Sequence, residues 1–213
     1  MSRILVVAAH PDDDVLGCGG TIARHVKEGD EVRTLYMADG VGARDGSGAD
    51  IRYAEAEKAN KILGVTDWSS LSFPDNAMDS VRLLDVVKAI ETHISDYEPR
   101  VIYTHHEHDL NIDHEITHRA IMTACRGYVR KIVINAFEIL SCTEQRNTFK
   151  PNVFVDITEC IDTKLDAVLQ YKSEIRKWPH PRSANGVNTL SMYRGAAIGV
   201  EHAEAFELVR GIS

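Results

Sequence analysis

The chain has 213 residues, 44% of them hydrophobic and 26% charged, which is typical of one globular α/β domain with a sizeable core. The formal net charge of −8 argues against a broad phosphate-binding surface, so nucleic acid is not an expected partner. No apolar run approaches the roughly 20 residues of a membrane span, and residues 1–3 lead directly into a predicted strand without a signal peptide.

Strands and helices are predicted to alternate along the chain. Short apolar runs predict strands at residues 3–8, 32–37, 68–73, 101–104, 131–137 and 153–157. Apolar positions every three or four residues predict helices at 14–27, 51–63, 80–95, 115–126 and 161–173, with short helices at 188–195 and 202–209. This βαβα order predicts a single domain over residues 1–213, with a mostly parallel sheet and helices on both faces.

The first chemical cluster is His10-Pro11-Asp12-Asp13-Asp14, which follows the apolar run 4–9. It therefore lies at the carboxyl end of a strand, where ligand sites form in open α/β sheets. Three adjacent carboxylates need a neutralising partner, and His nitrogen and Asp oxygen both bind zinc. The alternative is an acidic turn, with Asp14 capping the next helix and His10 facing solvent. The spacing alone leaves both interpretations open.

Glycines surround this cluster. Gly17, Gly19 and Gly20 do not match the GxGxxG register of a dinucleotide site, so we expect them to serve close packing. The stretch 38–50 contains four glycines and is predicted to be a flexible active-site loop.

The second cluster spans residues 105–114 and follows the predicted strand 101–104. The carboxyl ends of parallel strands share one edge of a sheet, so the two clusters can meet there. Two ligands from the first loop and one from the second would leave a water position open on zinc, which is the catalytic pattern. A polar loop in which His105 and His106 face water is the alternative.

A rival metal motif overlaps the second cluster. The segment His114-Glu115-Ile116-Thr117-His118 matches the HExxH signature of zincin peptidases, with Glu115 as base. The longer metzincin form fails, because Ile121 and Ala124 replace its Gly and its third His. The zincin hypothesis also leaves the first cluster without a function, so His118 is expected to be an ordinary helix residue.

The segment from Ala9 to Asp14 resembles the AHPDD motif of the PIG-L (LmbE-like) zinc-dependent N-deacetylases. The segment 109–114 is similar to that family's second motif, and 179–183, 194–195 and 203–206 resemble its C-terminal signatures. The resemblance implies a Rossmann-like fold over nearly the whole chain. It also implies that His10, Asp13 and His114 bind zinc and that Asp12 is the general base.

The chemistry of such a site suits amide hydrolysis. Zinc polarises a carbonyl and lowers the pKa of a bound water toward about 7, and Asp12 would take the proton and return it to the leaving amine. Asp113 is expected to hydrogen-bond a ligand histidine or to cap its helix. Many family members carry His where this chain has Asn111, which donates a hydrogen bond but transfers no proton. Stabilisation of the oxyanion is therefore assigned to Asn111, His108 or His180.

Substrate contacts are expected from Arg52, Asp75 and Arg182, with His180 beside them. Arg52 resembles a family position that contacts substrate, Asp75 could bind sugar hydroxyls, and a guanidinium such as that of Arg182 could meet a phosphate. Ion pairs within the protein or on its surface are the alternative for each.

The sequence thus predicts a zinc-dependent hydrolase that removes acetyl from an N-acetylated amino sugar, such as an N-acetylglucosamine-type glycoconjugate or nucleotide sugar. A zincin-type peptidase and a non-catalytic sugar-binding module are the alternatives. A homo-oligomer stays open, as does a divalent ion other than zinc. Lacking CxxC pairing, the four cysteines predict reduced thiols in a cytoplasmic protein: Cys18, Cys125, Cys142 and Cys160.

Overall fold

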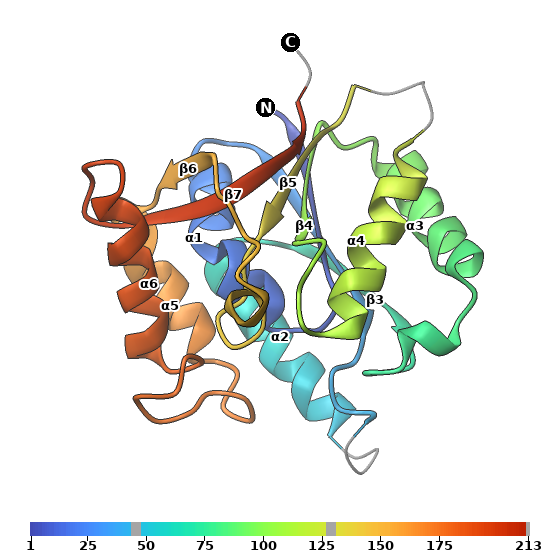
Figure 1. Ribbon diagram of the computed structural model, residues 1–213, viewed down its shortest axis with the longest axis horizontal. Coiled ribbons are helices and arrows are strands. Elements are labelled where there is room, and N and C mark those ends of the chain that lie inside the picture. Colours follow the sequence, from blue (N-terminus) through green and yellow to red (C-terminus); the bar gives the residue numbers. More distant parts are fainter. Residues whose placement is uncertain (44–47, 127–130, 212–213) are drawn as a thin grey trace.

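A seven-stranded sheet organises the computed structural model, which describes residues 1–43, 48–126 and 131–211 (Figure 1). Its spatial order is β3-β2-β1-β4-β5-β7-β6. Strands β1 to β5 are parallel, and β7 runs antiparallel to both β5 and β6. The mostly parallel sheet predicted from the sequence is therefore confirmed. The strands are β1 (Arg3–Ala8), β2 (Glu31–Ala38), β3 (Asp67–Phe73), β4 (Val101–His105), β5 (Val133–Phe137), β6 (Val153–Asp156) and β7 (Ala203–Arg210).

Helices cover both faces of the sheet, with α3 and α4 on one side and α1, α2 and α5 on the other (Figure 1). Strand β1 shows why two layers are needed. Its side chains alternate, so Ile4 and Val6 join one apolar cluster and Leu5 and Val7 join the other. The helices are α1 (Asp13–Lys27), α2 (Ala49–Leu63), α3 (Leu83–Tyr97), α4 (Ile112–Ala124), α5 (Ile161–Val168) and α6 (Ala184–Ala196), with short 3-10 helices η1 (Met78–Ser80), η2 (Thr143–Arg146) and η3 (Thr158–Cys160).

Helix α1 is kinked at Cys18, whose φ of −144° and ψ of 23° are not helical. The kink leaves backbone groups without helical partners, and two buried side chains from other elements bind them. Glu204 of β7 accepts hydrogen bonds from the backbone N–H groups of Gly20 and Thr21, and Lys164 of α5 donates to the Leu16 carbonyl. Lys164 Nζ lies 2.5 Å from Glu204 Oε1, so each buried charge has a partner.

The predicted close packing of the α1 glycines agrees with this arrangement. A Cβ atom added to Gly20 would lie 2.7 Å from Ile157, and one added to Gly17 would overlap the ring of Phe137. Gly19 is less crowded, because its Cβ would lie 3.4 Å from Lys164.

The prediction of a short helix at 202–209 was wrong, because these residues belong to β7. A short apolar stretch does not distinguish helix from strand, and pairing with β5 and β6 across long sequence separations decides the outcome. The helix predicted at 161–173 ends earlier, at Val168. Helix α6 confirms the helix at 188–195 but begins four residues earlier, at Ala184. The centre of the predicted flexible loop, residues 44–47, lies outside the described residues.

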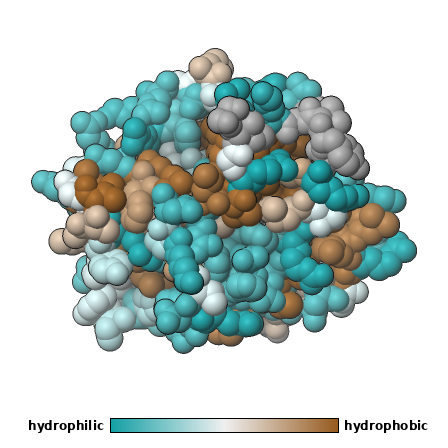
Figure 2. All heavy atoms as spheres, turned by 45° about the horizontal axis from the view of Figure 1, so that its top comes forward, coloured by the Kyte–Doolittle hydropathy of each residue, from teal (hydrophilic) through white to brown (hydrophobic). Residues whose placement is uncertain are grey.

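None of the helices in the described part of the chain combines the length and hydrophobicity of a bilayer span. Hydrophilic residues cover most of the face shown in Figure 2, and hydrophobic residues show between them in a band across its middle.

Candidate metal centre and active site

The two predicted clusters meet at the carboxyl edge of the sheet. His10 follows β1, Asp13 is the first residue of α1, and His114 lies in the first turn of α4 after β4. All three side chains are buried. The ring centroids of His10 and His114 are 5.5 Å apart, so both imidazoles can reach one ion.

The donor set fits a metal. Asp13 Oδ2 lies 3.2 Å from His10 Nδ1 and 3.2 Å from His114 Nε2. Two ligands of a tetrahedral zinc at about 2.0 Å are separated by about 3.3 Å, so these spacings match. Asp13 Oδ1 and His114 Nε2 are buried and make no hydrogen bond among the described residues. Buried polar atoms without partners are costly, and a cation between them would satisfy both.

Carboxylates hold the other nitrogen of His10. Its Nε2 lies 3.0 Å from Asp113 Oδ2 and 3.1 Å from Asp75 Oδ1. The backbone amides of Asn76 and Met78 donate to Asp113 at 2.6 and 3.0 Å. Carboxylates only accept hydrogen bonds, so Nε2 carries a proton, and Nδ1 would offer its lone pair to a cation seated beside Asp13. The expected contact between Asp113 and a ligand histidine is therefore present.

Asp12 has a strained backbone, with φ of 123° and ψ of −27°. A non-glycine residue in such a conformation typically costs about 1–3 kcal/mol and is found mainly at functional sites. Arg182 Nη1 donates to Asp12 Oδ2 at 3.2 Å, and Arg52 Nη1 lies 3.6 Å from the same oxygen. The turn thus holds a buried carboxylate next to the donor set.

The three adjacent carboxylates have different acidities. Burial raises the pKa of Asp12 to about 6, although Arg182 and Arg52 oppose that rise. Burial also raises the pKa of Asp14 to about 7, against a hydrogen bond from the Tyr36 hydroxyl. Burial would raise the pKa of Asp13 too, but the neighbouring histidines, first among them His114, hold it well below its usual value.

The arginines that were expected to contact substrate contact the protein. Arg52 is only 2% exposed, donates to the Pro11 carbonyl at 2.8 Å and pairs with Glu174. Arg182 is more accessible, with 22% of its side chain exposed, and donates to the Ser141 hydroxyl as well as to Asp12. Both arginines therefore help to hold the Asp12 turn.

Two other predicted contacts also lie within the protein. Asp75 is buried, contacts His10 and accepts a hydrogen bond from the amide of Ala43 at 2.9 Å. Asn111 is the N-cap of α4: its Oδ1 accepts from the Asp113 amide at 2.8 Å, and its Nδ2 donates to Asn76 Oδ1 at 3.0 Å. Asp113 and Asp14 were each considered as caps, but Asn111 caps α4 and Asp12 occupies the cap position of α1.

The remaining histidines have separate environments. His105 and His106 are buried, so the alternative in which they face water was wrong. His108 and His180 are exposed; His108 lies 3.6 Å from Glu107, and His180 Nδ1 accepts from the Arg182 amide. His118 Nδ1 lies 2.8 Å from the His105 carbonyl oxygen, and no metal-sized ligand group among the described residues contains His118.

One residue with a defined contact had received no role from the sequence. Asp109 is buried, and its Oδ1 lies 3.2 Å from His114 Nδ1. Its position five residues before His114 is a signal that could have been used, because both residues follow β4 at the same sheet edge.

The fold and the site together define a class: a Rossmann-like α/β protein with two histidines and one aspartate converging at the carboxyl edge of a parallel sheet. Comparisons with known proteins identify the family. The model of the family described as PIG-L: GlcNAc-PI de-N-acetylase matches residues 5–125, which include both motifs. The chain belongs to this family.

Individual relatives agree with that assignment. The uncharacterized deacetylase YaiS of Escherichia coli K12 is 35% identical over 176 residues, covering 80% of this chain and 90% of YaiS. The diacetylchitobiose deacetylase of Thermococcus kodakarensis is 27% identical over 228 residues, covering 100% of this chain and 85% of that protein.

The same fold also occurs in a protein of solved structure whose name gives a different activity. GalB, the 4-carboxy-2-hydroxymuconate hydratase of Pseudomonas putida KT2440, superposes with a TM-score of 0.84 at 21% identity, covering 100% of this chain and 98% of GalB. At that identity the likeness concerns the fold alone, so the reaction has to be argued from the site and the closer relatives.

Proposed function

We propose that this protein is a zinc-dependent N-deacetylase that releases acetate from an N-acetylated amino sugar of the N-acetylglucosamine type. One observation carries the proposal. The ligand atoms of His10, Asp13 and His114, which come from two loops about a hundred residues apart in sequence, lie within 4.8 Å of one another. Membership in a family of de-N-acetylases gives the reaction class.

The residues divide the work of hydrolysis. A zinc ion at the His10, Asp13 and His114 site would supply a Lewis acid for the acetyl carbonyl and for water. Asp12 removes the proton from the attacking water as the new C–O bond forms. It then delivers that proton to the sugar nitrogen as the C–N bond breaks, giving acetate and a free amine. Arg182 and Arg52 hold the Asp12 carboxylate in place.

The negative charge on the carbonyl oxygen needs a hydrogen-bond donor. We assign this role to Asn111, because its Nδ2 group carries two hydrogens and uses one on Asn76. His108 and His180 are less suited, since both side chains are exposed. Asp113 keeps the proton of His10 on Nε2, so that Nδ1 is the nitrogen available to the metal.

The substrate is a small molecule, and its remaining groups would meet the rim of the site. Asp75 is proposed as the residue that a sugar hydroxyl would approach and Arg182 as the residue that a phosphate would approach, and His180 lies on the same loop as Arg182. Arg52 is proposed to act through Asp12, because it is almost completely buried. All four cysteines carry free thiols, which supports a cytoplasmic location.

The decisive experiment measures acetate released from a panel of N-acetyl sugars, with metal content determined on the same samples. The wild-type protein should release acetate, lose activity on chelation and regain it with zinc. His10→Ala should abolish activity, and His118→Ala, the matched histidine of the zincin hypothesis, should retain it. Bound metal with no acetate from any sugar would instead favour a sugar-binding module. Activity that survives His10→Ala and is lost in His118→Ala would favour a peptidase.

A further inference from the structure

We propose that Asp109 is a positioning residue of the metal centre, which holds His114 in the ring orientation and tautomer that leave Nε2 available to the metal. This inference rests on the proposed metal-dependent function. It adds a residue that the sequence motifs left without a role.

The surroundings of Asp109 fix its carboxylate. The residue is fully buried in the segment between β4 and α4. The Thr143 hydroxyl donates to Oδ2 at 2.6 Å, and the Asn111 amide donates to Oδ1 at 3.0 Å. With a donor on each oxygen, the carboxylate is held against rotation.

The fixed carboxylate faces His114. Its Oδ1 lies 3.2 Å from Nδ1, while Nε2 on the other side of the ring lies 3.2 Å from Asp13 Oδ2. Nδ1 makes no full hydrogen bond with the described residues, and such contacts commonly tighten when a site is loaded. The His105 ring stacks on His114 with centroids 3.8 Å apart, which limits how far the ring can tilt.

The chemistry of the pair selects one tautomer. With a cation seated between Nε2 and Asp13, the single proton of a neutral His114 belongs on Nδ1, where the Asp109 carboxylate can accept it. Metal-binding histidines commonly donate their second N–H to a carboxylate. His10 has the corresponding arrangement with Asp113, so each histidine of the donor set has its own buried carboxylate.

A second metal position at this point is the competing explanation, because ligand atoms of His105, Asp109 and His114 also lie within 4.8 Å. His105 Nε2 accepts a hydrogen bond from the Ala9 amide at 2.8 Å, so that lone pair is occupied. The neutral ring then carries its proton on Nδ1 and has no lone pair left for a metal. The Asp109 carboxylate therefore serves His114.

The test compares zinc affinity in the intact protein, stripped of metal and titrated with zinc against a chromophoric chelator. Asp109→Asn keeps the shape of the side chain and removes its charge, and we expect affinity to fall about 10- to 100-fold. Glu107→Gln is the matched control, because it removes an exposed carboxylate from the same loop. It should change the affinity less than about twofold.

Two further measurements separate positioning from a general loss of structure. The unfolding temperature of the metal-free protein should be similar in Asp109→Asn and wild type, and the rise produced by zinc should be smaller in the variant. Thr143→Val, which removes one donor to Asp109, should weaken zinc binding in the same direction by less. This second variant decides the outcome if metal-free Asp109→Asn does not fold.

The positioning role is overturned if Asp109→Asn binds zinc as tightly as wild type. If Asp109→Asn does not fold, equal zinc affinity in Thr143→Val and wild type overturns it instead. Either result leaves the proposed hydrolase intact. A wild-type protein that binds no divalent metal overturns both proposals.

Discussion

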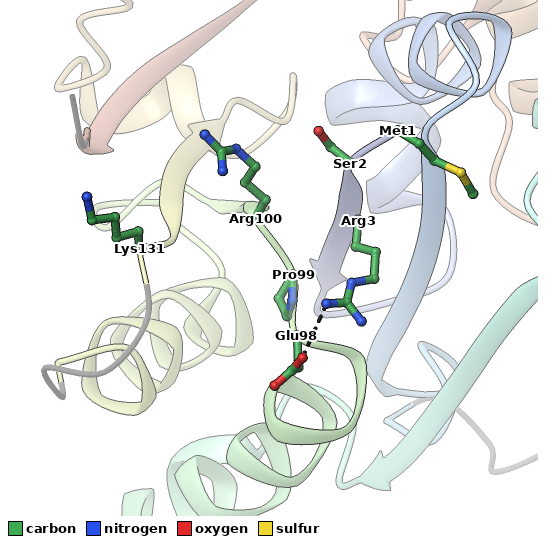
Figure 3. Close-up of a pocket in the computed structure, with 7 residues that line it drawn as sticks. All are labelled: Met1, Ser2, Arg3, Glu98, Pro99, Arg100 and Lys131. Carbon is green, nitrogen blue, oxygen red and sulfur yellow. Dashed lines mark hydrogen bonds and ion pairs between the residues drawn. The ribbon is translucent and has the colours of Figure 1, made fainter.

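The two edges of the sheet differ in how far their charged residues are exposed to solvent. At the amino edge, a hollow of about 530 Å³ is lined by residues that include Arg3, Glu98, Arg100 and Lys131 (Figure 3). Arg3 pairs there with Glu98 at 3.3 Å, and both side chains are about half exposed. At the carboxyl edge, His10, Asp12, Asp13, Asp75, Asp109, Asp113 and His114 are all buried.

The difference shows that a large surface hollow does not by itself mark the active site. Water solvates the charges of the amino edge, so an ion pair there contributes little to the free energy of unfolding. The charges of the carboxyl edge have lost their water, and only a specific set of partners makes their burial tolerable. Burial and charged neighbours shift the pKa values of Asp12, Asp13 and Asp109, and shifted pKa values of this kind cluster at functional sites.

The largest expected effect concerns the base. Asp12→Asn keeps the shape of the side chain but cannot accept a proton, so turnover on an N-acetyl sugar should fall by about 10²- to 10⁴-fold. Metal content, measured on the same sample, should be unchanged because Asp12 is not in the donor set. Near-normal turnover with a full metal content would show that another group is the base.

A comparison of one substitution at both edges should separate buried from exposed charge. Arg52→Met removes the ion pair between Arg52 and the buried Glu174 carboxylate. We therefore expect the free energy of unfolding to fall by about 3 kcal/mol. Arg3→Met, at the amino edge, should cost less than about 1 kcal/mol. Denaturant titration of both variants measures the two values, and equal costs would remove the distinction between the edges.

The smallest expected effect concerns how closely α1 approaches the sheet. Gly20→Ala places a methyl group 2.7 Å from Ile157, and overpacking of this kind should cost about 1–3 kcal/mol. Gly19→Ala meets Lys164 at 3.4 Å and should be neutral or stabilising by up to about 1 kcal/mol. Thermal unfolding of the pair tests this, and a similar loss for both glycines would contradict the packing argument.

Much of the fold could be predicted from the sequence, because hydrophobic periodicity is a local signal. The apolar run before His10 identified β1, and the apolar stripe within 80–95 identified α3, which spans Leu83–Tyr97. Residues 202–209 could not be assigned in this way, since their identity as a strand depends on partners far away in the chain.

The candidate site also has a part that the sequence could predict and a part that it could not. Residue types and spacing were sufficient to predict that the two clusters meet, because parallel strands end at one edge, and the resemblance to the family motifs pointed to His10, Asp13 and His114 within them. The partners of these residues could not be derived. Whether Arg52 reaches a substrate or Glu174, and whether Asp109 faces water or His114, depends on burial and on distances between separate elements.

By itself the sequence determined the layered α/β architecture, which follows from local pattern, and indicated the candidate metal-binding residues through their chemistry and their resemblance to family motifs. Only the tertiary structure decided which of the charged side chains lose their water and which groups then neutralise them. The physical reason is that the environment of a charge is set by neighbours brought together in folding, which no local stretch of sequence contains.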